Sequence, residues 1–145
     1  MKIFIKFLAT GFYSGFFPYF PGTVGSLLAF IIAWFLKLDL LSIFLLSILG
    51  VYLCTQGELL FQKHDCSHIV YDEFCGAFCA AWQLSSLPQF IIAFVLFRFF
   101  DIDKPVPINN LQALPRGWGV MADDLAAGII TRLLLAVFIY FGIMS

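Results

Sequence analysis

Acidic side chains are concentrated in two polar stretches of this strongly apolar chain. Eight of the nine carboxylates fall between Glu58 and Asp124. Two adjacent pairs, Asp72-Glu73 and Asp123-Asp124, each lie at the edge of a hydrophobic segment, where an unpaired charge is costly. Hard oxygen ligands of this kind suit Mg²⁺, which binds one or two carboxylates together with waters and substrate phosphate. The pattern therefore predicts a site for a divalent metal.

Two neighbouring side chains cannot always bind the same ion. On a helix, Asp72 and Glu73 point about 100° apart. Both can therefore ligate one ion only near a helix end, or if a second metal is present. The second pair follows the glycines of Gly117–Gly119 at the start of the last apolar run, where helix capping could account for one of its two carboxylates.

Arg98, Asp101 and Lys104 recur every three residues and so follow one face of a helix. The two basic side chains can neutralise a phosphate, while Asp101 can face a metal on the same stripe. The alternative is an ion-paired stripe at a membrane interface, with Arg98 extending toward lipid headgroups.

The segment Pro21–Ser26 combines two glycines with the hydroxyls of Thr23 and Ser26, just before an apolar run. Glycines let the backbone approach a ligand closely. The free N–H groups at a helix N-terminus suit a phosphate. An ordinary helix cap would explain the same residues, and the lysine of a Walker loop is missing.

The polar segment before the first acidic pair carries other titratable residues. His64 and His68 are four residues apart but lack the intervening glutamate of an HExxH zinc site, so we interpret them as loop or interfacial residues. Asp65 is a candidate general base or a group that supports the metal ligands. Glu58 is predicted to end a helix and Asp103 to be a solvated charge, and neither is assigned to the site.

The composition indicates that lipid is the main solvent of this protein. Of its 145 residues, 62% are hydrophobic and only 12% are charged, against about 45–50% and about 25% in soluble domains. The length suits a single domain, residues 1–145. A net charge of −1 and the absence of a basic stripe do not predict binding to nucleic acid. The four cysteines show no CxxC spacing, and packing is the simplest use of Cys75 and Cys79.

Four apolar runs are candidates for membrane helices: residues 24–36, 40–54, 74–97 and 125–144. A spanning helix needs about 20 residues. The third run contains Pro88, which cannot continue a helical hydrogen-bond ladder and disfavours helix in the residue before it. Either this run crosses once, or the chain turns there and residues 72–86 and 88–102 form a helical hairpin.

The hairpin is the favoured topology because it gathers the costly charges on one face. Residues 22–26, 58–73 and 98–124 then share that face, while the turns at 37–39 and 85–88 lie on the other, together with the C-terminus. The predicted fold is all-α: a polytopic integral membrane helical bundle of about four to five short membrane helices. Helices of about 16 residues would require local thinning of the bilayer or partial insertion.

Basic residues predict the orientation. Lys63, Arg98, Lys104 and Arg116 lie on the acidic face and Lys37 alone marks the opposite turn, so the positive-inside rule places the acidic face in the cytoplasm. The N-terminal segment has no clear small-residue cleavage site. Residues 2–20 are therefore predicted to form a retained, aromatic-rich interfacial segment.

In order and spacing, these motifs resemble those of the phosphatidylglycerophosphatase A family of bacterial membrane lipid phosphatases. The matching pieces cover roughly residues 11–130 and are Pro-Gly-Thr-Val-Gly-Ser at 21–26, His-Asp and Ile-Val-Tyr-Asp-Glu within 64–73, Phe-Arg-Phe-Phe-Asp-Ile-Asp-Lys-Pro at 97–105, and Gly-Trp-Gly-Val-Met-Ala-Asp-Asp-Leu-Ala-Ala-Gly at 117–128. Tyr71 and Trp118 depart from the usual pattern, but neither replaces a charged residue.

The resemblance implies Mg²⁺-dependent hydrolysis of phosphatidylglycerophosphate to phosphatidylglycerol and inorganic phosphate in the bacterial inner membrane. The implied metal ligands are Asp72, Glu73, Asp101, Asp123 and Asp124. The implied phosphate-binding residues are Thr23, Ser26, Arg98 and Lys104. The implied catalytic residues are Asp65, Asp72 and Asp123. No cysteine or histidine stands in a known phosphatase nucleophile motif, so direct attack by water is predicted, and an aspartyl-phosphate intermediate is the alternative that the sequence leaves open.

A small transporter or channel that relays ions through buried carboxylates is the alternative function. It would place acidic residues in the middle of membrane segments and connect both faces. A structural membrane subunit whose charges pair with a partner chain is a further possibility. Neither explains why hydroxyls, glycines, bases and carboxylates occur together.

Overall fold

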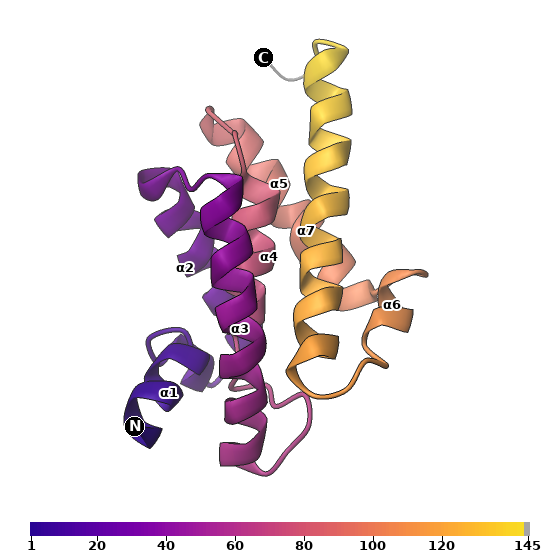
Figure 1. The fold of residues 1–145 in the computed structure, drawn as a ribbon. Coiled ribbons are helices and arrows are strands. Elements are labelled where there is room, and N and C mark those ends of the chain that lie inside the picture. The colour runs from indigo at the N-terminus through magenta and orange to yellow at the C-terminus, as the bar shows by residue number, and fades with distance from the viewer. Residues whose placement is uncertain (144–145) are drawn as a thin grey trace.

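The structure is a computed structural model that describes residues 1–143, and these residues are all-helical (Figure 1). The elements in chain order are α1 (Lys2–Ala9), the 3₁₀ turn η1 (Ser14–Phe16), α2 (Pro21–Leu36), α3 (Leu40–Phe61), α4 (Tyr71–Ala81), α5 (Leu87–Asp103), α6 (Ile108–Leu111) and α7 (Gly117–Tyr140). Residue 144, the end of the last predicted apolar run, and residue 145 of the predicted domain lie outside the described residues.

The chain turns between α4 and α5, so the predicted helical hairpin is found and residues 74–97 do not form one continuous helix. The first helix of the hairpin ends at Ala81 rather than at residue 86. Gln83 adopts a left-handed φ of 58°, which interrupts the helix. Pro88 lies in the first turn of α5, where its missing N–H needs no partner.

Loops far apart in sequence meet at one end of the bundle. Lys37 and Asp39, from the turn between α2 and α3, line one cavity with Gln83 and Leu84, from the turn between α4 and α5. The C-terminal end of α7 points toward the same end (Figure 1). Both acidic pairs lie nearer the opposite end, Asp72-Glu73 in the first turn of α4 and Asp123-Asp124 in the second turn of α7. The arrangement predicted from the hairpin is therefore found in the described part of the chain.

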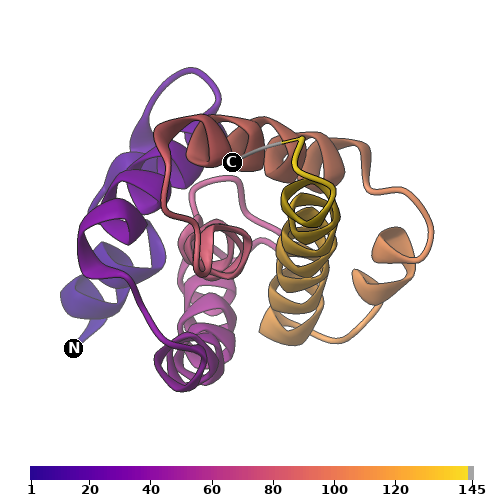
Figure 2. The same ribbon diagram turned by 90° about the horizontal axis from the view of Figure 1, so that it is seen from above.

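Helix α4 occupies the centre of the bundle, with α2, α3, α5 and α7 around it (Figure 2). Its most extensive contact is with α7, and two glycines make this contact possible. A Cβ on Gly76 would lie 2.6 Å from the carbonyl oxygen of Asp124, and a Cβ on Gly128 would collide with the carbonyl oxygen of Gly76. The two backbones therefore touch, and this contact holds the middle of α4 against the N-terminal half of α7.

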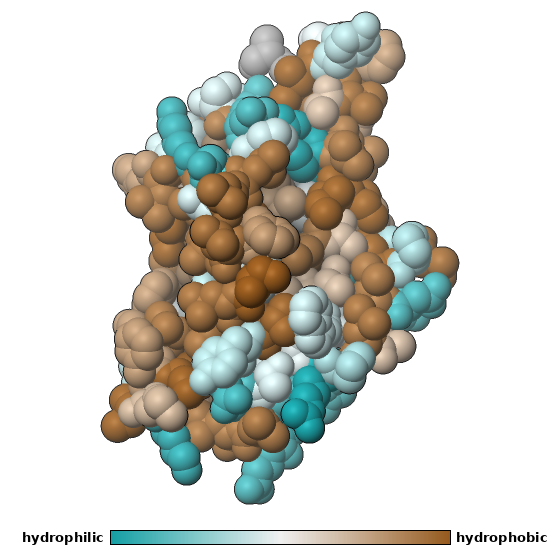
Figure 3. Space-filling view, viewed as in Figure 1, coloured by the Kyte–Doolittle hydropathy of each residue, from teal (hydrophilic) through white to brown (hydrophobic). Residues whose placement is uncertain are grey.

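The surface is rich in exposed apolar side chains. Hydrophobic residues cover the middle of the face in Figure 3, and hydrophilic residues gather toward its upper and lower ends. Within residues 1–143, α3 alone is both long and apolar enough to cross a membrane, and α2 is a shorter apolar helix. The 11 residues of α4 rise about 16 Å, roughly half the thickness of a hydrocarbon core.

Candidate active site

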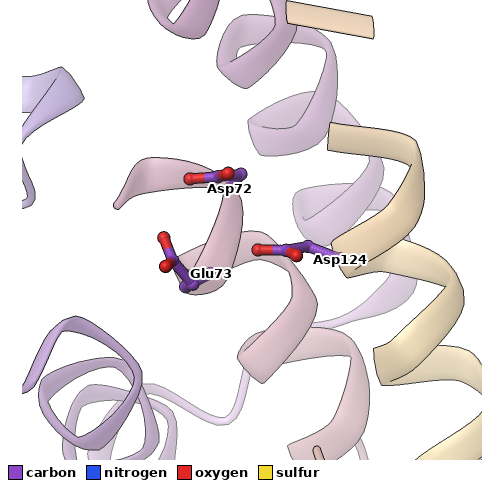
Figure 4. A group of neighbouring side chains, drawn as sticks. All are labelled: Asp72, Glu73 and Asp124. Atoms are coloured by element: carbon purple, nitrogen blue, oxygen red, sulfur yellow. The ribbon is translucent and has the colours of Figure 1, made fainter. Parts of the chain in front are cut away.

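Three carboxylates, Asp72, Glu73 and Asp124, form a compact group that we name the acidic centre. Each contributes one oxygen, and these oxygens lie within 4.8 Å of one another. The first two come from the first turn of α4 and the third from α7, and all three face a common space (Figure 4). The position at a helix end is the condition under which both members of the α4 pair can approach one ion.

Each residue of the acidic centre has an oxygen without a protein partner. Asp72 Oδ1, Glu73 Oε2 and Asp124 Oδ2 are buried and accept no hydrogen bond. Burying a carboxylate oxygen without a donor is costly, and three such oxygens close together repel one another. A divalent cation with hard-ligand preference would satisfy all three at once. The residues present therefore fit Mg²⁺.

Asp123 lies next to the acidic centre but is paired within the protein. Its Oδ2 accepts a hydrogen bond of 2.5 Å from Lys104 Nζ, and its Oδ1 accepts the backbone N–H of Asp124 at 2.9 Å. Lys104 ends α5 with a left-handed φ of 43°, which turns it out of the helical stripe. Burial opposes its charge, but the hydrogen bond and charge of Asp123, with Asp124 and Asp101 nearby, raise the pKa of Lys104 above its ordinary value.

Arg98 connects two helices beside the acidic centre. Its Nη1 donates to Asp101, one turn away on α5, and also to Ser26 Oγ on α2, at 3.3 Å. Asp101 is buried, and its negative charge repels those of Glu73 and Asp124. The same face of α5 therefore carries the Arg98–Asp101 ion pair and lies beside the acidic centre. The ion-paired stripe and the predicted phosphate-binding stripe do not exclude each other.

Residues 21–26 form the N-terminal end of α2, which begins at Pro21, so Thr23 and Ser26 lie near a helix N-terminus as predicted. Ser26 Oγ donates to the carbonyl of Gly22 at 2.7 Å, so this hydroxyl is one turn away from the free N–H groups. Thr23 is half-buried in the first turn. Gly22 packs against Glu73, because a Cβ at this position would collide with Glu73 Oε1. The glycine thus lets the start of α2 reach the acidic centre.

Asp65 lies in the loop between α3 and α4 and is exposed. Its carboxylate accepts a hydrogen bond from Gln112 Nε2 at 2.8 Å, and its backbone N–H donates to Glu58 at 3.0 Å. Glu58, which also pairs with His64 at 2.7 Å, thus organises this loop. Asp65 is not among the three clustered carboxylates, and its role as a base stays a prediction.

Two glycines that shape the site were not singled out from the sequence. Gly76 and Gly128 bring α4 against α7, and the small side chains near them, such as Ala77 and Ala127, were the available signal. Arg132 donates its Nε–H to the carbonyl oxygen of Trp82, just beyond the end of α4, and lies over the Trp82 ring. A cation is favourable at the C-terminus of a helix. The contact therefore holds the far end of α4, the helix that carries Asp72.

Comparison with known proteins finds a family model and relatives under two names, one of them a putative phosphatidylinositol-3-phosphatase of Bacteroides thetaiotaomicron that is 34% identical over 145 residues, covering 90% of each chain. Residues 7–139 match the family model described as Phosphatidylglycerophosphatase A. The chain is 42% identical over 134 residues to a phosphatidylglycerophosphatase A of Haemophilus influenzae, covering 86% of this chain and 82% of that protein. It is 41% identical over 133 residues to the Escherichia coli protein of the same name, covering 86% and 77%. No solved structure is a significant match.

Proposed function

This chain belongs to the phosphatidylglycerophosphatase A family, and on that premise we propose that it hydrolyses phosphatidylglycerophosphate to phosphatidylglycerol and inorganic phosphate in a Mg²⁺-dependent reaction. The observation that carries the metal dependence is the acidic centre, with its three buried oxygens that lack a partner. A phosphomonoester brings the negative charge that such a metal and the neighbouring cations would neutralise.

Each group of residues has a separate task in this proposal. The acidic centre would hold Mg²⁺, with Asp101 and Asp123 as the additional predicted ligands beside it. When bound, Mg²⁺ supplies a Lewis acid for the phosphoryl oxygens and lowers the pKa of a water. Arg98 and Lys104 would neutralise phosphate oxygens, and the predicted contribution of Thr23 and Ser26 is hydrogen bonding to them.

Asp123 would also hold Lys104 toward the phosphate, through the hydrogen bond between them. Asp65 is the predicted general base. We propose direct attack by water, since no cysteine or histidine stands in a known phosphatase nucleophile motif. The proposal predicts that acid quenching during turnover traps no labelled phosphoprotein.

We further propose that the protein is a multi-pass protein of the bacterial cytoplasmic membrane with the acidic centre facing the cytoplasm. The exposed apolar side chains of α2, α3 and α5 support embedding in lipid. The basic residues near the acidic end support the orientation. The short α4 would lie enclosed by the other helices, and α3 would be one of the helices that span the bilayer.

The test is phosphate release from phosphatidylglycerophosphate by the purified full-length chain in detergent, with Mg²⁺ or with EDTA. Release that requires Mg²⁺ is expected, and Asp72→Asn should abolish it. Asp103→Asn is the matched control, because Asp103 is an exposed carboxylate outside the site. Equal release in EDTA, or no release at all, would contradict the proposal.

A further inference from the structure

Helices α2 and α5 pack antiparallel, with contacts that recur every four residues. At the first level, Arg98 of α5 donates to Ser26 of α2. One turn along each helix, the rings of Phe30 and Phe94 lie 5.7 Å apart, and after another turn those of Trp34 and Phe90 lie 4.9 Å apart. The series is therefore polar at the acidic centre and apolar along the rest of its length.

A groove follows the apolar levels of this series. It has a volume of about 320 Å³ and an almost wholly apolar lining. Its walls are the half-exposed side chains Leu27, Ile31 and Trp34 of α2 and Leu87 and Ile91 of α5. From the level of Ser26 to the level of Trp34, α2 rises about 12 Å. One end of the groove, at Phe30 and Phe94, thus lies one helical turn from Ser26 and Arg98, and the other points away from them.

We propose that this groove between α2 and α5 binds one acyl chain of the lipid substrate while Arg98 and Ser26 hold the headgroup phosphate. This inference rests on the proposed function and extends it to how the lipid is placed. The lipid carries an anionic phosphate at one end and hydrocarbon at the other. The contact between α2 and α5 has the same order, with Arg98 and Ser26 at one end and the apolar groove along the rest. A bound chain would align the phosphate with the acidic centre.

A second apolar cavity, of about 290 Å³, is a less suitable place for this chain. Its lining comes from the N-terminal segment and from α2, α3 and α4, and includes Leu49 and Phe74. No residue of α5, the helix that carries Arg98, contributes to it. An acyl chain there would not lead to the cation that pairs with Ser26. This cavity supplies the matched control.

The kinetic test compares wild type, Ile91→Trp and Leu49→Trp. The measured quantity is kcat/KM for phosphate release from dibutanoyl, dihexanoyl and dioctanoyl phosphatidylglycerophosphate at one detergent concentration. Each methylene that enters the groove should raise kcat/KM by at most about fourfold. I91W, which fills the groove, should lower the dioctanoyl-to-dibutanoyl ratio at least tenfold. L49W should keep the wild-type ratio.

A binding test does not depend on turnover. In a Trp82→Phe/Trp118→Phe background, Trp34 in the groove is the remaining tryptophan. Phosphatidate with brominated chains should quench its fluorescence more strongly than brominated phosphatidylcholine, and Arg98→Ala should remove that preference.

If I91W does not fold, Leu87→Trp at the far end of the groove replaces it in the kinetic test. L87W should reduce only the rise in kcat/KM from the dihexanoyl to the dioctanoyl substrate.

The outcomes separate the two proposals. If wild type releases no phosphate from any chain length, the proposed function fails, and the quenching still decides whether the groove binds a phosphate lipid. If phosphate is released but I91W keeps the wild-type chain-length ratio, the groove proposal is overturned. A loss of the ratio in L49W instead would place the chain in the second cavity and also overturn it.

Discussion

Two groups of buried charges lie side by side in this protein and differ in how they are balanced. Asp123 and Asp101 each pair with a cation of the chain, Lys104 and Arg98. In residues 1–143, no Lys or Arg forms an ion pair with Asp72, Glu73 or Asp124 of the acidic centre. The paired group has its cations within the protein, whereas each carboxylate of the acidic centre keeps a buried oxygen without a partner.

The two groups also depend on different parts of the fold. The pairs form within α5 and between the end of α5 and α7, where long flexible side chains can find each other. The acidic centre instead depends on backbone contact between α4 and α7 at Gly76 and Gly128. Short carboxylate side chains can meet only if their helices approach closely. The acidic centre is therefore the more sensitive of the two to helix packing.

Asp124→Asn should produce the largest loss of turnover. It should also distinguish the two groups by the sign of the change in apparent Tm. Loss of a ligand should lower turnover by more than about 100-fold, the upper range for residues that merely support metal ligands. In EDTA, the same change should raise the apparent Tm, because it removes one of three carboxylates that repel one another. Thermal unfolding in detergent and phosphate release measure the two quantities.

Asp123→Asn is the matched control for that difference in sign. It leaves Lys104 without its partner, and breaking a partly buried pair is destabilising, so the apparent Tm in EDTA should fall. If D124N and D123N shifted the Tm in the same direction, the distinction between an unbalanced and a balanced group would be wrong.

Gly128→Val should weaken the acidic centre without changing any charge. The new side chain collides with the backbone of Gly76, and overpacking of this kind costs about 1–3 kcal/mol. Misplacing a site by about 1 Å can cost about 100-fold in rate. We expect a loss of turnover of about that size and a smaller rise in Tm on adding Mg²⁺.

Ile129→Val, at the next position, is the control for G128V, because Ile129 is half-exposed and away from the backbone contact. It should keep both the turnover and the Mg²⁺-dependent rise in Tm. Wild-type turnover in G128V would show that the close approach of α4 and α7 is not what assembles the acidic centre.

A double-mutant cycle between Asp123 and Lys104 should give an intermediate effect and define the role of Asp123. If Asp123 acts by holding Lys104, then Lys104→Met and the double variant should have the same kcat/KM, about 10–100-fold below wild type. If Asp123 also binds the metal, the double variant should be clearly worse than K104M. Phosphate release from one substrate at saturating Mg²⁺ is sufficient for this measurement.

Much of this arrangement could be predicted from local sequence. Pro88 marked the turn that brings both acidic pairs to one end, and the i,i+3 spacing placed Arg98 and Asp101 on one face. The early end of α4 at Ala81 and the pairing of Asp65 with Gln112 could not be predicted, because they depend on a single left-handed residue and on a loop contact across 47 residues. Contacts between helices are decided by packing, which a local pattern does not specify.

Asp103→Asn should have the smallest effect, and for that reason it tests whether position or charge alone matters. Asp103 is two residues from Asp101 and next to Lys104, but its side chain is exposed at the end of α5. Substitution of an exposed charge usually changes stability by no more than about 0.5 kcal/mol, and solvent screens its field. Turnover should stay within about twofold of wild type at moderate ionic strength. A tenfold loss would mean that the acidic centre depends on the total negative charge at this end of the molecule and not on which carboxylates are buried without a partner.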